Sequence, residues 1–235
     1  DVRTGRIVGA EGLMRWNHPT RGLLTAAEFL PFAEEIGLMV PISNWMLEAL
    51  CRDVQEWNHA GATGVRLSLN ASPQYLDRGD LFDRIRQALE FYGIAPQQIE
   101  VEITENICIR NPQHAIEQLK KLHQIGVSTA IDDFGTGYSS LAYLHRFPVN
   151  TIKIDQAFVR EIKEADGHFP VVLAIISIAR GLDLTVIAEG VESAYQAHYL
   201  EKSGCHTMQG YLFHKPMPQG QLLALLRENG AARVA

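Results

Sequence analysis

The sequence predicts an α/β protein of the (β/α)8 type, a TIM barrel, and two observations lead to this fold class. Apolar runs rich in Val, Ile, Leu and Thr alternate with stretches of helical periodicity along the 235 residues. Each of these runs also ends in a carboxylate, an amide or an ammonium group. Parallel strands that close into a ring gather such end groups at one face, where barrel enzymes carry their sites.

Seven runs are expected to be strands, each ending in polar residues. In chain order they are IVGAEGL near Glu11, VRLSLN at Asn70, IEVEITE with Glu102 and Glu105, STAIDD with Asp132 and Asp133, TIKID with Lys153 and Asp155, TVIAEGVE with Glu189 and Glu192, and HTMQGY with Gln209. A closed barrel of this type has one strand more, and the turn-like residues 1–6 lead straight into the first run. We therefore expect this chain to lack an N-terminal strand, which roughly ten to twenty upstream residues would supply.

Helices are expected between the strands. After the first strand the helical pattern covers 26–37, where Pro31 is expected to interrupt it, and resumes over 41–61 with Pro41 at its start. Later helices are expected over 81–93, 111–126, 139–147, 169–183, 193–204 and 218–229. This regular alternation predicts a parallel sheet with right-handed crossovers.

The composition predicts one globular domain over residues 1–235, with 46% hydrophobic and 20% charged residues. The net charge of −6 and the lack of a long Lys/Arg run argue against a groove for a DNA or RNA polymer. Three cysteines without CxxC spacing fit buried thiols in a reducing compartment, and no apolar run reaches the ~18 residues of a membrane span. We therefore expect a cytoplasmic domain, even if other domains anchor the full-length protein to a membrane.

The oxygen-bearing side chains at the strand ends suggest a metal centre. The candidate ligands come from five strands and are Glu11, Asn70, Glu102, Asp132, Asp133 and Glu189. Hard oxygen ligands select Mg²⁺ or Mn²⁺ over zinc. Two such ions ~3.5–4 Å apart can stabilise the attacking and leaving oxygens of phosphoryl transfer. Ca²⁺ is expected to inhibit, because it prefers more ligands at longer distances.

The segment DDFGTGYSSL at 132–141 is the most specific one. Adjacent aspartates on a strand normally point to opposite faces, but the turn at a strand end could bring both to one cluster. Gly135 and Gly137 would then form a mobile loop over the mouth of the site. Taken alone, the segment fits a plain strand-to-loop turn with solvated acids equally well.

Other polar residues near the strand ends have alternative interpretations. Lys153 could steer or deprotonate an attacking water, and it could also form a structural ion pair with Asp155. Arg15 could grip a phosphate or lie at the surface. Glu105 could anchor the glycine loop, and Glu192 could orient a ligand from behind.

Seven short motifs follow one another over nearly the whole chain. They are EGLMR (11–15), LNAS (69–72), EITE (102–105), DDFGTGYSSL (132–141), KID (153–155), AEGVE (188–192) and QGY (209–211). This series resembles that of the EAL-domain phosphodiesterases, bacterial enzymes that linearise cyclic di-GMP to pGpG. A lone EGL would carry no weight, whereas the ordered series is specific.

The resemblance implies a barrel whose N-terminal strand is antiparallel to the others, and two bound ions of Mg²⁺ or Mn²⁺. One ion would be held by Glu11, Asn70, Glu102 and Asp132, and the other by Asp132, Asp133 and Glu189. Lys153 would sit by the attacking water, Glu105 would position the loop at 134–141, and Gln209 would complete the polar network. Asp155 and Glu192 join the catalytic group, and the substrate-binding candidates are Leu13, Arg15 and Asn70.

The sequence departs from the family pattern at three places. Gly12 replaces the signature alanine, which is expected to cost little beyond backbone freedom. Asn106 follows EITE where serine is usual, a change expected to be mild. The family's first strand, with its tyrosine-glutamine-proline segment, would precede Asp1, so this chain is expected to lack the strand that closes the barrel and one substrate contact.

Three functions remain open. The leading one is metal-dependent hydrolysis of cyclic di-GMP, and the second is an EAL-like receptor that binds the nucleotide with weak or no catalysis. The third is another metal-dependent barrel enzyme that uses Lys153, although such chemistry does not need an aspartate pair with a glycine loop. The resemblance also allows a homodimer through this domain, and it implies sensory or GGDEF domains elsewhere in a longer protein.

Overall fold

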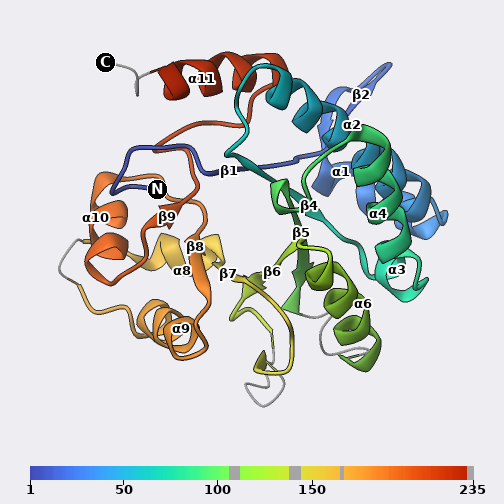
Figure 1. Ribbon diagram of the computed structural model, residues 1–235. Coiled ribbons are helices and arrows are strands. Elements are labelled where there is room, and N and C mark those ends of the chain that lie inside the picture. Colours follow the sequence, from blue (N-terminus) through green and yellow to red (C-terminus); the bar gives the residue numbers. More distant parts are fainter. Residues whose placement is uncertain (106–111, 138–143, 165–166, 232–235) are drawn as a thin grey trace.

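The computed structural model describes residues 1–105, 112–137, 144–164 and 167–231. Within these residues the seven predicted strands form one curled parallel sheet that follows chain order (Figure 1). The strands are β1 (Gly9–Glu11), β4 (Arg66–Asn70), β5 (Ile99–Thr104), β6 (Ser128–Phe134), β7 (Thr151–Ile154), β8 (Thr185–Ala188) and β9 (Thr207–Met208). The predicted fold class is confirmed, as a half-barrel to which the described residues contribute seven strands, one fewer than a closed ring has.

Helices lie outside the curled sheet (Figure 1). They are α1 (Ala26–Glu35), α2 (Met39–His59), α3 (Pro73–Asp77), α4 (Leu81–Tyr92), α6 (Pro112–Gln124), α8 (Gln156–Glu161), α9 (Pro170–Gly181), α10 (Ala194–Lys202) and α11 (Gln219–Ala231), with a 3-10 turn at Pro96–Gln98. Between helices and sheet lies the apolar core, in which Val101, Ile103 and Ile152 are completely buried. Burial of this layer is the main force that holds the helices on the sheet.

The inner face of the half-barrel is polar instead. Side chains alternate between the two faces of a strand, so Glu100 and Glu102 flank Val101 on β5 but face inward. Thr151 and Lys153 do the same on β7. These four side chains are at most 2% exposed. The sheet therefore carries its charged groups in the interior, where TIM barrels usually pack branched apolar residues.

The sheet stays open between its first and last strands. Among the described residues, β1 pairs only with β4, and β9 pairs only with β8. A side-chain hydrogen bond crosses the opening, from Gln209 Nε2 to Glu11 Oε2 at 2.7 Å. At the other end of β9, the N–H of Val2 donates to the carbonyl of His206 at 2.9 Å. These bonds hold the two edge strands together without a strand between them.

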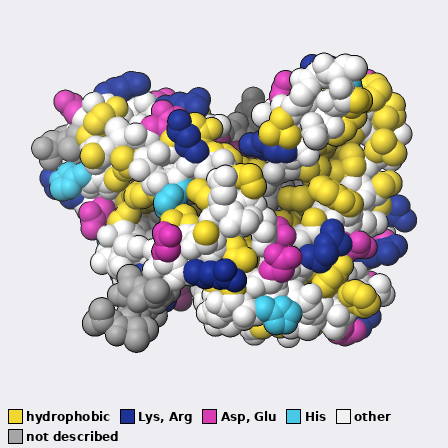
Figure 2. Space-filling model, turned by 90° about the horizontal axis from the view of Figure 1, so that it is seen from above, with side chains coloured by type: hydrophobic (Ala, Val, Ile, Leu, Met, Phe, Trp, Pro, Cys, Tyr) yellow, Lys and Arg dark blue, Asp and Glu magenta, His cyan; other side chains and the backbone are white. Residues whose placement is uncertain are grey.

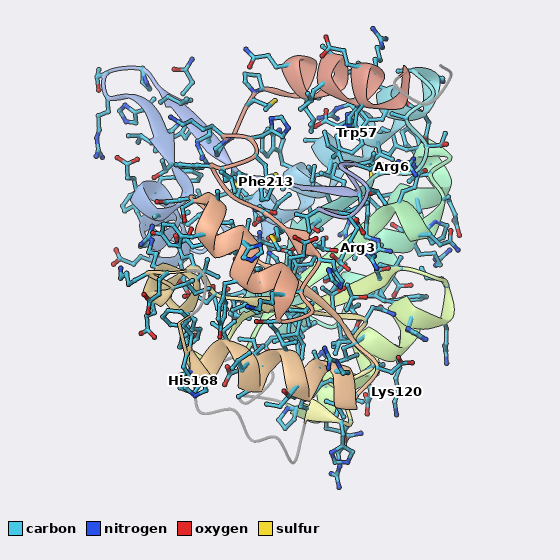
Figure 3. The ribbon with its side chains drawn as sticks, turned by 90° about the vertical axis from the view of Figure 1, so that its left-hand side faces the viewer. Arg3, Arg6, Trp57, Lys120, His168 and Phe213 are labelled. Atoms are coloured by element: carbon cyan, nitrogen blue, oxygen red, sulfur yellow. The ribbon has the colours of Figure 1, made fainter. Side chains whose placement is uncertain are left out.

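The last helix, α11, lies over the C-terminal end of α2 (Figures 1 and 3). Gln219 of α11 donates to Glu56 Oε2 at 2.6 Å, and Trp57, labelled in Figure 3, is 1% exposed beneath it. Asn229 accepts from the N–H of Ile7 at 3.2 Å. α11 thus ties the N-terminal segment to the helical layer.

Two expectations about local structure were wrong. β2 (Arg15–His18) and β3 (Gly22–Thr25) form an antiparallel hairpin that the strand prediction missed. α1 also continues through Pro31, although proline lacks the N–H for the helical bond and its ring crowds the preceding turn, and a capping box between Thr25 and Glu28 secures the first turn. α2 begins at Met39, two residues before Pro41. The helix expected over 139–147 falls largely outside the described residues.

On the face shown in Figure 2, basic and acidic side chains are interspersed and form no continuous field of one sign. None of the described helices has the length and apolarity needed to cross a lipid bilayer.

Candidate metal centre

The buried ammonium group of Lys153 lies at the centre of the carboxylates that end the strands. Its Nζ is 2.7 Å from Glu102 Oε2, 2.5 Å from Glu189 Oε1, 3.2 Å from Asp132 Oδ1 and 3.7 Å from Glu11 Oε2. The side chain of Lys153 is only 2% exposed. The predicted convergence of strands β1, β5, β6, β7 and β8 on one point is therefore observed.

One cation faces more anionic groups than it can neutralise, and the pKa values reflect this. The pKa of Glu102 is raised to about 8, chiefly by burial and also by Glu11 and Asp132, against the opposing effect of Lys153. Burial likewise raises the pKa of Glu189 to about 7. Burial alone would lower the pKa of Lys153, but the surrounding carboxylates hold it above its usual range. The site thus has an excess of negative charge that an added divalent cation would relieve.

The two adjacent aspartates reach the same cluster because the backbone turns between them. Asp133 has a φ of 53°, in the left-handed region, and the pairing of β6 with β7 shifts register between Ile131 and Phe134. Asp132, Asp133 and Glu189 can each place a carboxylate oxygen within 4.8 Å of the other two. Such backbone strain costs about 1–3 kcal/mol and is typical of functional sites. These three residues could together hold a cation.

Glu11 is held on both sides by amide groups. Asn70 Nδ2 donates to its Oε1 at 2.8 Å, and Gln209 Nε2 donates to its Oε2 at 2.7 Å. These contacts join the ends of β1, β4 and β9. They fix the carboxylate of Glu11 beside Lys153. Both bonds use the amide nitrogens, so the amide oxygens of Asn70 and Gln209 take no part in them.

Gly12 occupies more crowded surroundings than its sequence suggests. A Cβ at this position would lie 2.7 Å from Leu50 Cδ2 and 2.7 Å from Met46 Cε, both on α2. Leu50 and Met46 therefore fill the space of the missing methyl group. An alanine here would require the ends of these two side chains to move.

The loop that follows β6 is anchored by Glu105, as one interpretation predicted. The N–H of Gly135 donates to Glu105 Oε2 at 2.9 Å, and Glu105 is 5% exposed. Gly135 has a φ of 97°, and a Cβ on it would lie 2.9 Å from Phe158 Cε2, so a glycine is required. Gly137 is the last residue of this loop that the structure describes, and residues 138–141 lie outside the described part.

Asp155 does not form the ion pair with Lys153 that was one alternative for that lysine. It is the N-cap of α8, where its Oδ1 accepts from the N–H of Ala157 at 2.7 Å, and it also shares a hydrogen bond with Asp133. The pKa of Asp133 is raised to about 6, chiefly by burial and also by the neighbouring Asp132 and Asp155. Asp155 therefore joins the cluster through Asp133.

The other predicted residues lie at the edge of the site. Leu13 is 43% exposed. Arg15 begins β2, and its Nη1 donates to the carbonyl of Met14 at 2.8 Å. Glu192 is exposed and immediately precedes Ser193, the N-cap of α10. None of these three side chains is among the four ion-pair partners of Lys153.

Two glycines that were not singled out shape the ends of β8 and β9. Gly190 has a φ of 64°, and a Cβ on it would lie 2.5 Å from Gln156 Cβ. Gly210 packs directly against the backbone of Val191, and the N–H of Val191 donates to the carbonyl of Gln209 at 3.0 Å. The motifs AEGVE and QGY therefore form one close-packed unit, which places Glu189 and Gln209 at the cluster.

Comparison with known proteins agrees with this fold and site. The family model described as EAL domain matches residues 1–216. The bifunctional diguanylate cyclase/cyclic di-GMP phosphodiesterase MucR of Pseudomonas aeruginosa is 40% identical over 220 residues, which cover 94% of this chain and 32% of that protein. The cyclic di-GMP phosphodiesterase PdeR of Escherichia coli is 41% identical over 214 residues, covering 91% of this chain and 32% of that protein. The chain thus spans about a third of the length of these relatives.

Solved structures show the same similarity. The PaMucR phosphodiesterase in complex with c-di-GMP superimposes with a TM-score of 0.87 and 39% identity, over 92% of this chain and 87% of that chain. The EAL domain of Mycobacterium smegmatis DcpA gives a TM-score of 0.81 and 32% identity, over 97% and 94% of the two chains. With these relatives and the polar cluster at the strand ends, the chain belongs to the EAL domain family of cyclic di-GMP phosphodiesterases.

Proposed function

We propose that this protein hydrolyses one phosphodiester bond of cyclic di-GMP, with Mg²⁺ or Mn²⁺, to give linear pGpG. The observation that carries the proposal is the complete set of oxygen ligands around Lys153, on the fold of relatives named as cyclic di-GMP phosphodiesterases. A module that only binds the nucleotide needs no such set.

Two divalent ions fit the donors that are present. One would be held by Glu11, Asn70, Glu102 and Asp132, and the other by Asp132, Asp133 and Glu189. The second group is supported by the proximity of its three carboxylates, and the first by the raised pKa of Glu102 among anionic neighbours. When bound, such ions stabilise negative charge on the reacting phosphate and lower the pKa of a water molecule.

Lys153 would hold the attacking water by donating a hydrogen bond to it, once ions on the neighbouring carboxylates free one of the N–H donors that Glu102, Glu189 and Asp132 now occupy. An ammonium group has three donors and no acceptor, so in its charged form it orients a water without deprotonating it. Its carboxylate neighbours favour this charged form. Leu13, Arg15 and Asn70 would contact the nucleotide at the mouth, Glu105 would position the loop at Gly135 and Gly137, and Asp155, Glu192 and Gln209 would support the reacting groups.

A product assay tests the proposal. The protein is incubated with cyclic di-GMP and Mn²⁺, and the products are separated by chromatography. We expect pGpG to form with Mn²⁺ or Mg²⁺, and no product to form in excess chelator or with Ca²⁺ as the sole metal. Turnover in chelator would contradict the two-ion assignment.

The receptor alternative has a distinct outcome. Equilibrium binding of cyclic di-GMP in Ca²⁺, followed by no product in Mn²⁺, would replace hydrolysis with recognition alone. The matched control for variants of the candidate metal ligands is Glu90→Ala on α4, since Glu90 is an exposed carboxylate that pairs with Arg86 on the same helix. This variant should retain the parent rate.

A further inference from the structure

A second polar layer lies inside the half-barrel, one step below the carboxylate cluster. Its centre is Glu100 of β5, which is 2% exposed. Glu100 Oε2 accepts from Thr151 Oγ1 at 3.0 Å and from Arg66 Nη1 at 3.2 Å, and its Oε1 accepts from Ser68 Oγ at 3.3 Å. Ser68 is 8% exposed and Thr151 is 1% exposed. We call Glu100, Arg66, Ser68 and Thr151 the Glu100 layer.

The layer joins the strands that carry three residues of the site. Ser68 lies two residues before Asn70 on β4, and Glu100 lies two residues before Glu102 on β5. Thr151 lies two residues before Lys153 on β7. Because the side-chain period of a strand is two, each member faces the same interior as the site residue that follows it. The hydrogen bonds of Glu100 therefore link these three strands directly beneath the site.

Strand β6 lies between β5 and β7, yet Glu100 reaches across it. Ala130 of β6 pairs with Glu102 on one side and with Thr151 on the other. Ala130 is two residues before Asp132, so it faces inward, and its side chain is a single methyl group. This small residue leaves the space through which the carboxylate of Glu100 contacts Thr151.

The charge of Glu100 is matched within its own layer. Arg66 forms the ion pair with Glu100, whereas the ion pairs of Lys153 are with the carboxylates of the cluster above. The layer can therefore fix the strands without drawing the ammonium of Lys153 out of the site.

We propose that the Glu100 layer positions the site. Glu100 and Thr151 are positioning residues that fix where Asn70, Glu102 and Lys153 lie relative to one another along their strands. This inference rests on the proposed two-ion function. Buried side-chain bonds across strands are specific to one register, so their loss lets the ligands shift even where the sheet remains folded.

The test compares two buried threonines of neighbouring strands. Thr151→Val removes the bond to Glu100, whereas Thr129→Val removes a bond of similar kind, from Thr129 Oγ1 to the carbonyl of Pro148 at 2.8 Å. Thr129 is 0% exposed and precedes Ala130, so it faces the helices and not the interior. The two substitutions therefore match in burial and chemistry, and differ in the face on which they act.

Free Mn²⁺ is measured by electron paramagnetic resonance during titration of the metal into each variant, and the hydrolysis rate is measured alongside. We expect Thr151→Val to bind Mn²⁺ about tenfold more weakly than Thr129→Val, the size of effect that loss of outer support of metal ligands produces. Its kcat should fall more than its KM changes. Equal Mn²⁺ affinity in the two variants would overturn the inference.

Three further variants keep the test decisive. Glu100→Gln retains an oxygen and a donor for the two hydroxyl groups and should keep most of the Mn²⁺ affinity, whereas Glu100→Leu should lose it. Ser68→Ala serves as a second single-hydroxyl variant if Thr151→Val does not fold. Mn²⁺ binding without hydrolysis in the parent protein would refute the proposed function and leave this comparison valid, whereas no Mn²⁺ binding would refute both.

Discussion

Replacing Lys153 by methionine removes the only cation with ion pairs to four carboxylates of the described site, and it preserves most of the side-chain volume. The side chain that carries the ammonium is buried, with only 2% of it exposed. Its removal leaves carboxylates in a low-dielectric interior without their counter-ion. We therefore expect the metal-free protein to be destabilised.

The size of the effect follows from the site. Removing one partner of a buried ion pair costs about 3–5 kcal/mol. Four carboxylates argue for the upper end, but burial raises the pKa of Glu102 to about 8, so this carboxylate can take up a proton when the ammonium is lost. The remaining charges can also take up protons. We therefore expect the free energy of unfolding to fall by about 3 kcal/mol at pH 7 in chelator.

Urea unfolding of the parent and of Lys153→Met, in chelator and in excess Mn²⁺, measures this change. Mn²⁺ should recover most of the lost stability in the variant, because the ions replace the missing positive charge and bind only the folded state. Hydrolysis in Mn²⁺ should nevertheless fall about 10²-fold in kcat with a smaller change in KM, since the water would lose its donor.

The matched control is Lys120→Met on α6, an exposed lysine labelled in Figure 3. It should change neither the stability nor the rate. If Lys153→Met lowers the free energy of unfolding no more than Lys120→Met does, the ammonium does not neutralise the cluster. If KM rises while kcat is unchanged, Lys153 binds substrate and does not act on the water.

Three other predictions address the same site. Glu11→Ala and Asp132→Ala should each abolish hydrolysis yet leave the circular dichroism spectrum and the melting temperature close to those of the parent, because relief of repulsion among crowded carboxylates offsets the hydrogen bonds and ion pairs that are lost; near-parental turnover in either folded variant would exclude that residue as a metal ligand. Because the pKa values of Glu102 and Glu189 are raised in the folded state, that state binds more protons than the unfolded chain, and stability in chelator should fall as pH rises from about 4.5 to about 8. Excess Mn²⁺ should flatten this slope in urea unfolding, and a slope that rises instead would contradict the stated pKa directions. Gly12→Ala should lower the free energy of unfolding by about 1 kcal/mol, because its methyl would press on Leu50 and Met46, and a more stable variant in urea unfolding would show that these side chains move freely.

The order of the sheet was predictable because its strands are consecutive and each has a clear apolar run. The hairpin was not, since β2 and β3 are four residues each and most of their side chains are exposed, so no apolar alternation marks them. Pro31 misled for a related reason: a sequence rule for proline cannot show that the capping box at Thr25 and the turns beyond hold the helix together.

The proximity of the candidate ligands was also predictable, because the carboxyl ends of parallel strands must meet at one face. What Lys153 contacts was not, since Asp155 is two residues away in sequence and yet caps α8, while Glu102 and Glu189 come from other strands. The role of Asp133 likewise depends on a left-handed backbone that no residue type announces.

The sequence by itself determined the strand order, the polar residues at each strand end and membership in the family, because local periodicity and motif spacing are properties of the chain alone. Only the tertiary structure decided which charged groups meet. It also decided that side chains of α2 occupy the space beside Gly12, and that Glu100 contacts Thr151 past Ala130. The physical reason is that these contacts depend on the curvature of the sheet, which brings together side chains 51 residues apart.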